Sequence, residues 1–207
     1  MTRPEATRYF PLSAAQRELW ALQESLPDVP LNIAQYVDIQ GRIDPELLVQ
    51  TTRHMVSEGQ FMQVRFERTA DGPIGVYDPT LDDAPVYLDL RSGDDPRAAA
   101  HAIMRDDYSR PVDPTVDRTV VGRLFRVGDD EYLFYHRAHH LVLDGVAGKE
   151  YMTKTMEAYS AAVRGEALPA GGELDFALPH RADDEYRRSA RWTRDRDYWQ
   201  AQVGELP

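Results

Sequence analysis

Apolar and polar positions follow two periods along this chain, one typical of helices and one of strands. Helical spacing, with start and stop signals, predicts helices at residues 13–26, 44–59, 96–108, 152–165 and 183–202. Alternation predicts strands at residues 32–41, 61–67, 73–78, 86–90, 118–127 and 131–140, the last two forming a hairpin through "GDD". The last helix is polar, and its expected anchors are Tyr186, Trp192 and Trp199. We therefore predict an α/β fold, with a mixed, largely antiparallel sheet and helices packed against it.

Composition narrows the classes of function. The 207 residues are 42% hydrophobic, which is enough for a substantial core, but the net charge of -11 leaves no basic face for nucleic acid. No apolar run is long enough to cross a membrane, and the first residues lack the apolar centre of a signal peptide, so we expect a cytoplasmic location. The absence of cysteine excludes disulfides, thiolate metal sites and a cysteine nucleophile.

The segment "RAHHLVLDGVAG", residues 137–148, carries the candidate chemistry. Successive strand residues face opposite sides, so His139 and His140 cannot both point into one small site while the strand continues. This argues against a two-histidine metal site and predicts one histidine for a site and one for the scaffold. Asp144 and Gly145 follow where the strand turns into a helix, and ligands of layered α/β proteins tend to bind beyond strand ends. A histidine there is suited to acid–base chemistry, because its ordinary pKa lies close to neutral pH.

Most histidines in proteins have no chemical role, and a lone histidine at this position would be assigned to the scaffold. We make that assignment for His54, His101 and His180. The pattern His-His-x-x-x-Asp-Gly is more specific, because background frequencies would produce it in a chain of this length on the order of once in a thousand. The pattern therefore favours a functional site.

Two motifs resemble those of the condensation domains of nonribosomal peptide synthetases, in the chloramphenicol acetyltransferase-like superfamily. "HHLVLDG", residues 139–145, matches the HHxxxDG motif of that family at every fixed position, and "LSAAQRELWAL", residues 12–22, is similar to its SxAQxxLWxL motif. The wider resemblance covers nearly all of the chain. "EYLFYHRAHHLVLDG" is most similar to condensation domains that open a synthetase polypeptide, as in the enterobactin synthetase family.

The resemblance implies a reaction and roles for the motif residues. Family members join a donor acyl or peptidyl thioester on one carrier protein to the amine of an aminoacyl thioester on a second, each on a phosphopantetheine arm. His140 would act as the general base or stabilise the tetrahedral intermediate, and His139 would belong to the scaffold. Asp144 would orient the turn through a salt bridge, and Gly145 would leave the backbone bare where the thioester approaches. No directly bound cofactor and no metal are expected.

One motif departs from the family pattern. The arginine expected three residues before the phenylalanine of RHExLRTxF is Gln63 here, which puts its usual salt bridge to the motif aspartate in doubt. Arg65 lies on the same strand face as Gln63, and we predict that it pairs with Asp144 instead. The alternative is that Arg65 is an exposed partner of residues near Glu67.

The second departure is length. Family members have two similar lobes, so residues 1–207 are expected to be the N-terminal lobe, with the C-terminal lobe absent from this chain and the isolated lobe inactive. The first motif starts about a dozen residues after Met1, so we expect the donor carrier protein to bind in trans, alongside an acceptor carrier protein and the C-terminal lobe. Candidate docking residues, unless they only form a solvated helix face, are Arg187, Arg188, Arg191, Arg194 and Arg196.

Two alternatives to amide formation stay open. A related domain could use the same histidine for ester formation, epimerisation or acyl transfer from coenzyme A. A recruitment module without catalysis could keep the fold, although it has no need for His140, Asp144 and Gly145 together. The donor and acceptor substrates are not legible from the sequence, because residues outside this chain would share the pocket.

Overall fold

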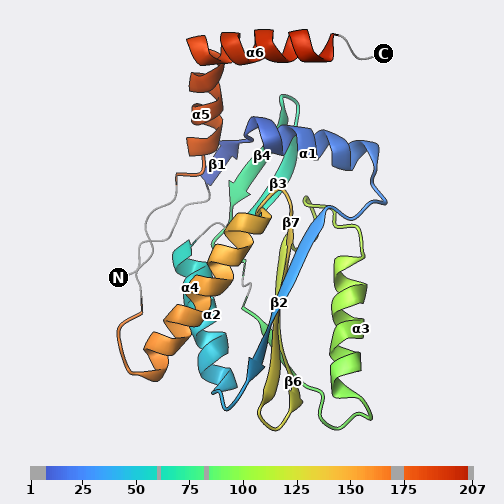
Figure 1. Ribbon diagram of the computed structural model, residues 1–207, viewed down its shortest axis with the longest axis vertical. Helices are drawn as coiled ribbons and strands as arrows, with labels where there is room; N and C mark the ends of the chain where they lie inside the picture. The colour runs from blue at the N-terminus through green and yellow to red at the C-terminus, as the bar shows by residue number, and fades with distance from the viewer. Residues whose placement is uncertain (1–7, 60–61, 82–83, 169–174, 205–207) are drawn as a thin grey trace.

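The computed structural model describes residues 8–59, 62–81, 84–168 and 175–204. In these residues seven strands form two sheets, four helices lie near the sheets, and two more, α5 and α6, extend away from them (Figure 1). The strands are β1 (Arg8–Pro11), β2 (Asn32–Gln40), β3 (Val64–Thr69), β4 (Gly72–Tyr77), β5 (Val86–Asp89), β6 (Val120–Gly128) and β7 (Glu131–His139). The helices are α1 (Ala14–Ser25), α2 (Pro45–Gly59), α3 (Pro96–Tyr108), α4 (Gly145–Val163), α5 (Leu178–Arg187) and α6 (Ala190–Val203).

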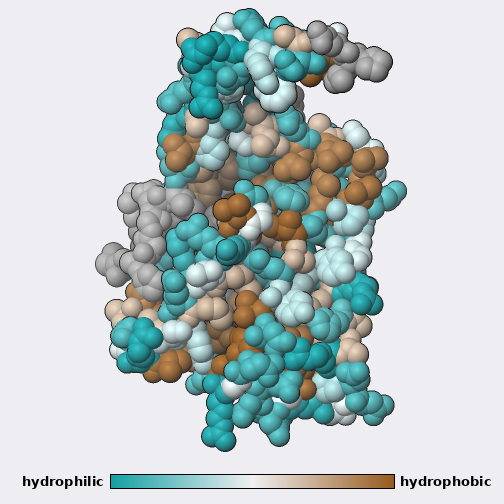
Figure 2. All heavy atoms as spheres, in the orientation of Figure 1, coloured by the Kyte–Doolittle hydropathy of each residue, from teal (hydrophilic) through white to brown (hydrophobic). Residues whose placement is uncertain are grey.

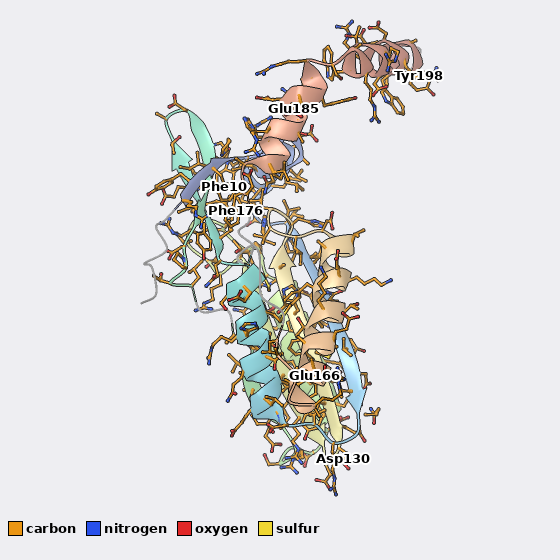
Figure 3. The ribbon with its side chains drawn as sticks, turned by 90° about the vertical axis from the view of Figure 1, so that its left-hand side faces the viewer. Phe10, Asp130, Glu166, Phe176, Glu185 and Tyr198 are labelled. Atoms are coloured by element: carbon orange, nitrogen blue, oxygen red, sulfur yellow. The ribbon has the colours of Figure 1, made fainter. Side chains whose placement is uncertain are left out.

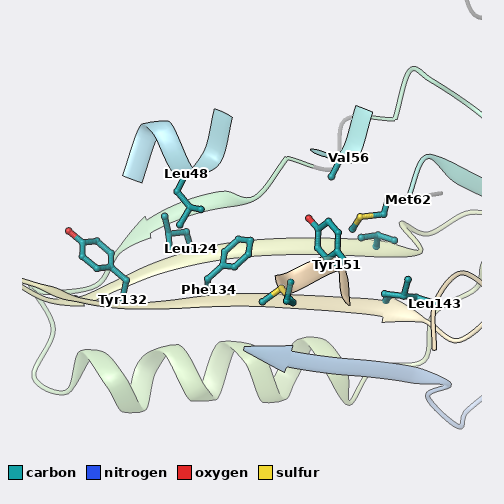
Figure 4. Packing of buried hydrophobic residues seen from close by; sticks show 11 residues of the cluster. Leu48, Val56, Met62, Leu124, Tyr132, Phe134, Leu143 and Tyr151 are labelled. Carbon is teal, nitrogen blue, oxygen red and sulfur yellow. The ribbon is translucent and has the colours of Figure 1, made fainter. Parts of the chain in front are cut away.

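The larger sheet has the order β2-β7-β6-β5, in which only β5 and β6 run parallel. Alternation along β7 gives this sheet two apolar faces, because Phe134 lies on one side and Leu133 on the other. Helices α2 and α4 cover the first face, and α3 covers the second. Figure 4 shows the first core, in which Leu48 of α2 and Tyr151 of α4 lie over the sheet. A mixed, largely antiparallel sheet with packed helices is thus confirmed.

The smaller sheet has the order β1-β4-β3 and is entirely antiparallel. Its β1 was not predicted, since four residues are too short to show a period. Phe10 of β1 and Phe66 of β3 pack with Trp20 of α1, and Leu141, which follows β7, joins the same cluster. This second core therefore joins the small sheet to the turn after β7.

The predicted helix over residues 183–202 is wrong as a single element. The structure has α5 and α6 instead, and they point in different directions above the body of the protein (Figure 1). The break is at Ser189, whose side chain accepts a hydrogen bond from the Trp192 backbone and starts α6. The prediction that aromatic residues anchor this segment is also wrong. Neither α5 nor α6 has a buried residue, and Trp199 is 62% exposed.

Phe176, which lies two residues before α5, packs against the small sheet. Its ring stacks on Phe10 at 5.0 Å and on Tyr77 at 5.3 Å between centroids, and Figure 3 shows it beside Phe10. The Asp183 carboxylate of α5 accepts a hydrogen bond from the backbone of Ala14 at the start of α1. None of the helices in the described ranges is both long enough and apolar enough to span a membrane.

Candidate functional site

The motif "HHLVLDG" forms the junction between β7 and α4, as its sequence predicted. The strand ends at His139, whose carbonyl accepts hydrogen bonds from the backbones of Val142, at 2.9 Å, and Leu143, at 3.4 Å. Helix α4 begins at Gly145, and Asp144 caps it by accepting a hydrogen bond from the Ala147 backbone at 2.8 Å. A strand, a tight turn and a capped helix therefore fix the backbone around the two histidines.

His139 is a scaffold residue. Its side chain is 0% exposed, and the Leu141 backbone N–H donates to Nδ1 at 3.1 Å, so the hydrogen of the neutral ring lies on Nε2. Nε2 donates to the Oε1 atom of Gln23 in α1 at 3.0 Å. Burial lowers the pKa of His139 to about 4, with His140 and Arg137 adding to the effect. The imidazole is neutral at physiological pH and ties α1 to the turn.

His140 differs from its neighbour in exposure and in hydrogen bonding. Its side chain is partly exposed, and its backbone N–H donates to the Leu31 carbonyl at 2.9 Å, next to the start of β2. Within the described part of the chain its ring makes no hydrogen bond or ion pair. The two rings differ in their surroundings, but β7 ends at His139 and His140 already lies in the turn, so the predicted strand alternation does not extend to His140. His140 is the one whose ring nitrogens remain available to a substrate.

The two sequence motifs meet at this turn. In the first motif, Gln16 Nε2 donates to the Leu141 carbonyl at 2.8 Å, and Leu12 and Trp20 pack in the cluster that contains Leu141. Ser13 and Gln16 also form a capping box, because the Ser13 side chain accepts from the Gln16 backbone and the Gln16 side chain accepts from the Ser13 backbone. Residues of the first motif thus contact the turn that contains the two histidines.

The predicted ion pair between Arg65 and Asp144 is wrong. Arg65 pairs with Glu67 itself, and its Nε lies 3.4 Å from Oδ2 of Asp78. The alternative considered from the sequence, an exposed arginine paired with residues near Glu67, comes closer, but the Arg65 side chain is half-buried. Both acidic partners lie in or directly after the small sheet that contains Arg65, whereas Asp144 is occupied as the cap of α4. Gln63, which replaces the family arginine, is buried and donates to the carbonyls of residues 79 and 81 at 3.3 and 3.0 Å.

Gly145 is not required by the local fold. It has no positive φ, and a Cβ added there would meet nothing within 4 Å. The space that a side chain would fill therefore stays open, at the first residue of α4 and in the same turn as His140. The neighbouring Val146 is 78% exposed, which leaves an apolar side chain at this surface.

Sequence reasoning missed a buried ion network that supports β7. The Arg137 side chain is buried, and its Nε lies 3.3 Å from Oδ2 of Asp107 in α3, while Nη1 donates to the Arg118 carbonyl at 2.9 Å. Tyr135 donates to the same carboxylate at 2.8 Å, and Arg123 lies 3.2 Å from it. Burial opposes ionisation, but these partners hold the pKa of Asp107 below its ordinary value. The sequence did contain a sign of this network, because Arg137 lies within a strongly apolar strand and a buried arginine needs a partner.

His136 lies on the other face of β7, toward α4. It is 2% exposed, its ring centroid is 5.0 Å from that of Tyr151, and its Nε2 atom has no hydrogen-bond partner among the described residues. Burial lowers the pKa of His136 to about 4, and the charge of Arg137 acts in the same direction. The side chain is too deep to reach a substrate at the surface.

The C-terminal arginines are only partly free. Arg188, Arg191 and Arg196 each lie within 3.7 Å of an aspartate that is near in the chain, as expected for a solvated face. In the described residues no ion pair involves Arg187 or Arg194. The described histidines and carboxylates also include no cluster of three arranged to hold a metal ion.

Comparison with known proteins identifies the family of this chain. The family model of the condensation domain matches residues 6–207. Among curated proteins, isonitrile lipopeptide synthase of Streptomyces coeruleorubidus is 36% identical over 200 residues, and enterobactin synthase component F of Shigella flexneri is 30% identical over 205 residues. These alignments cover 95% and 97% of this chain but only 14% and 16% of the relatives.

The chain belongs to the condensation domain family.

Solved condensation domains share the fold described above. The starter condensation domain of rhizomide synthetase superposes with a TM-score of 0.81 at 31% identity, covering 97% of this chain and 49% of that one. The first condensation domain of the calcium-dependent antibiotic synthetase, in complex with a substrate analogue, gives 0.84 at 27% identity, covering 97% and 48%. This chain thus spans about half the length of the condensation domains that it matches.

Proposed function

We propose that this chain is the histidine-bearing first half of a condensation domain that forms an amide bond. The observation that carries the proposal is the contrast within the turn after β7: His139 is sealed and fully hydrogen-bonded, while the ring of His140 is partly exposed and unpartnered in the described chain. Only one of the two rings can reach substrate.

In the proposed reaction the amine nitrogen of an aminoacyl thioester attacks the carbonyl carbon of a donor acyl thioester. The C–N bond forms, the C–S bond breaks, and the donor arm leaves as a thiol. His140 accepts the proton that the amine loses or hydrogen-bonds the tetrahedral intermediate. Gly145 leaves room beside it, because no side chain occupies the first residue of α4. Both substrates would arrive on phosphopantetheine arms, and the chain's own residues position them.

The experiment uses the complete two-half domain with a loaded donor carrier protein. The acceptor carrier protein is loaded with different amino acids in separate reactions, and its intact mass is measured after incubation. His140→Ala should lower amide formation by at least about 100-fold, the usual range for losing general acid–base catalysis, without changing the unfolding midpoint. Near-normal turnover in folded His140→Ala protein would refute the assignment.

The same assay separates the remaining alternatives. Two of these alternatives need a further readout, because an ester on an acceptor hydroxyl has the same mass as the amide and inversion of a stereocentre changes no mass. Cleavage of the product by mild base would identify an ester, chiral chromatography of the hydrolysed donor would identify inversion, and turnover with acyl-coenzyme A alone would identify acyl transfer from coenzyme A. No product in any arm, with carriers still bound, would identify a recruitment module.

For carrier binding we propose Arg187 and Arg194 as the first residues to test, because the other three C-terminal arginines have aspartate partners. Charge reversal of these two should weaken donor-carrier binding, most strongly at low salt. Reversal of the paired Arg191 is the matched control.

A further inference from the structure

Helix α3 ends beside the strands that lead into the histidine turn. The side chain of Asn32, the first residue of β2, donates to the carbonyl of Tyr108 at 3.1 Å and to that of Arg110 at 2.8 Å. Asn32 is paired with His139, the last residue of β7. In Figure 1, α3 runs along the sheet, and Figure 2 shows a largely hydrophilic outer surface over this helix. The contacts of α3 with the sheet therefore come from its inner side.

The Asp107 carboxylate, near the end of α3, lies between two arginines of the sheet. Oδ1 lies 3.2 Å from Nη1 of Arg123 in β6, and Oδ2 lies 3.3 Å from Nε of Arg137 in β7. Tyr135 donates to the same Oδ2 atom at 2.8 Å. The Arg137 side chain is only 6% exposed, and arginine keeps its charge in proteins. The carboxylate thus compensates a buried charge that cannot be lost by deprotonation.

Arg137 has a second contact, which reaches the segment before β6. Its Nη1 atom donates to the Arg118 carbonyl at 2.9 Å. The carbonyl of the next residue, Thr119, accepts a hydrogen bond from the His139 backbone at 2.7 Å, and the Thr119 hydroxyl donates to the Val64 carbonyl at 2.9 Å. The guanidinium therefore joins α3 to the backbone that holds the end of β7.

His140 directly follows the residues that α3 holds. Its backbone N–H donates to the Leu31 carbonyl at 2.9 Å, and Leu31 precedes Asn32, whose side chain is bound to the end of α3. On the other side, the His139 backbone donates to Thr119, the neighbour of the carbonyl that Arg137 binds. The backbone N–H groups of both motif histidines thus bond one residue away from a contact that leads to α3.

We infer that Asp107 and Arg137 are positioning residues for His140. Arg137 acts through the Arg118 carbonyl on the backbone of the turn, and Asp107 holds the Arg137 guanidinium in place. The inference rests on the proposed function, because it needs His140 to be the reacting residue. A general base must lie within hydrogen-bond reach of the proton it accepts, and a displacement of about 1 Å can lower a rate on the order of 100-fold.

The test compares the two arginines that share the Asp107 carboxylate. Arg137→Met removes an ion pair and the bond to the Arg118 carbonyl. The matched control, Arg123→Met, removes an ion pair with the other oxygen of the same carboxylate. Arg137→Lys keeps the positive charge but loses the planar fork that binds both partners.

Two measurements are made on the complete two-half domain. Amide formation with loaded carrier proteins gives kcat and the KM for the donor carrier. Hydrogen–deuterium exchange, followed by mass spectrometry of a peptide that covers residues 138–143, reports the backbone of the turn and does not depend on activity.

We expect Arg137→Met to lower kcat at least about tenfold and to change KM less than about twofold, because it displaces the reacting group and leaves the carrier surface intact. Exchange in the turn should become faster. Arg137→Lys should give an intermediate kcat. Arg123→Met should change kcat and the exchange rate less than about twofold, whatever its effect on the unfolding midpoint.

Equal losses of kcat in Arg123→Met and Arg137→Met that follow their unfolding midpoints would overturn the inference, because they would show that the network only stabilises the fold. A normal kcat in folded Arg137→Met would also overturn it. If Arg137→Met does not fold, Arg137→Lys decides: a lower kcat with faster exchange supports the inference, and a normal kcat overturns it. If the unmodified domain makes no amide, the proposed function fails, whereas unchanged exchange in the turn of the Arg137 variants overturns the positioning role alone.

Discussion

Replacing His139 by alanine should destabilise the protein far more than replacing His140. The His139 ring is fully buried and makes two hydrogen bonds, so its removal orphans the Leu141 N–H and the Gln23 Oε1. A buried group that loses its partner costs about 1–3 kcal/mol, and the lost ring contacts add to two such terms. The expected loss is on the order of 4 kcal/mol, a large part of the roughly 5–15 kcal/mol of a typical domain.

The measurement is urea unfolding at neutral pH, followed by circular dichroism, for His139→Ala, His140→Ala and Gln23→Ala. His140→Ala should change the free energy of unfolding by less than about 1 kcal/mol, because the ring is partly exposed and makes no hydrogen bond within the described chain. The double variant of His139 and Gln23 should lose at least about 1 kcal/mol less than the sum of the single losses. Strict additivity, or a loss below about 1 kcal/mol for His139→Ala, would refute the scaffold role.

Two further predictions concern pH and the cap of α4. The pKa of both His136 and His139 is about 4 in the folded protein against an ordinary 6.5, so between pH 6.5 and 4 protons bind preferentially to the unfolded chain and stability falls as pH falls. The difference of 2.5 amounts to about 3 kcal/mol for each histidine, and His136→Phe should remove about half of the loss between neutral and acidic urea midpoints; an unchanged loss would contradict this. Asp144→Ala should cost about 1 kcal/mol through the lost cap, and Arg65→Gln should add to it independently in the same unfolding assay. A coupling energy between the two substitutions above about 0.5 kcal/mol would contradict the structure, because it would show that Arg65 and Asp144 interact.

The sequence predicted those features that depend on near neighbours in the chain. The start of α3 follows from Asp95, which caps the helix, and from the proline at its first residue, and the structure has the helix at Pro96–Tyr108 as expected. The two faces of β7 likewise follow from strand alternation up to His139, where the strand ends, whereas His140 already lies in the turn. Each of these predictions needs only geometry within one element.

Predictions that needed the position of a second element were less secure. The strand face of Arg65 was right, but its partner depended on which sheet contains β3, and β3 belongs to the small sheet with Asp78 beside it. The division between α5 and α6 was missed because both helices are polar and bury nothing, so no apolar stripe marks where one ends. Ser189 was a usable capping signal inside that segment.

The contact between the two motifs changes what each of them means for function. Gln16 and Leu141 are 125 residues apart in the chain, yet the Gln16 side chain bonds to the Leu141 carbonyl, and Gln23 bonds to His139 from the same helix. Helix α1 thus holds the two residues that flank His140, while Asp144 only starts the helix that follows. The turn is therefore positioned by hydrogen bonds to neutral amides, which salt does not screen, and not by an ion pair with Arg65. It follows that a substitution in α1 can move His140 without touching it, and that its effect on turnover should persist at high ionic strength.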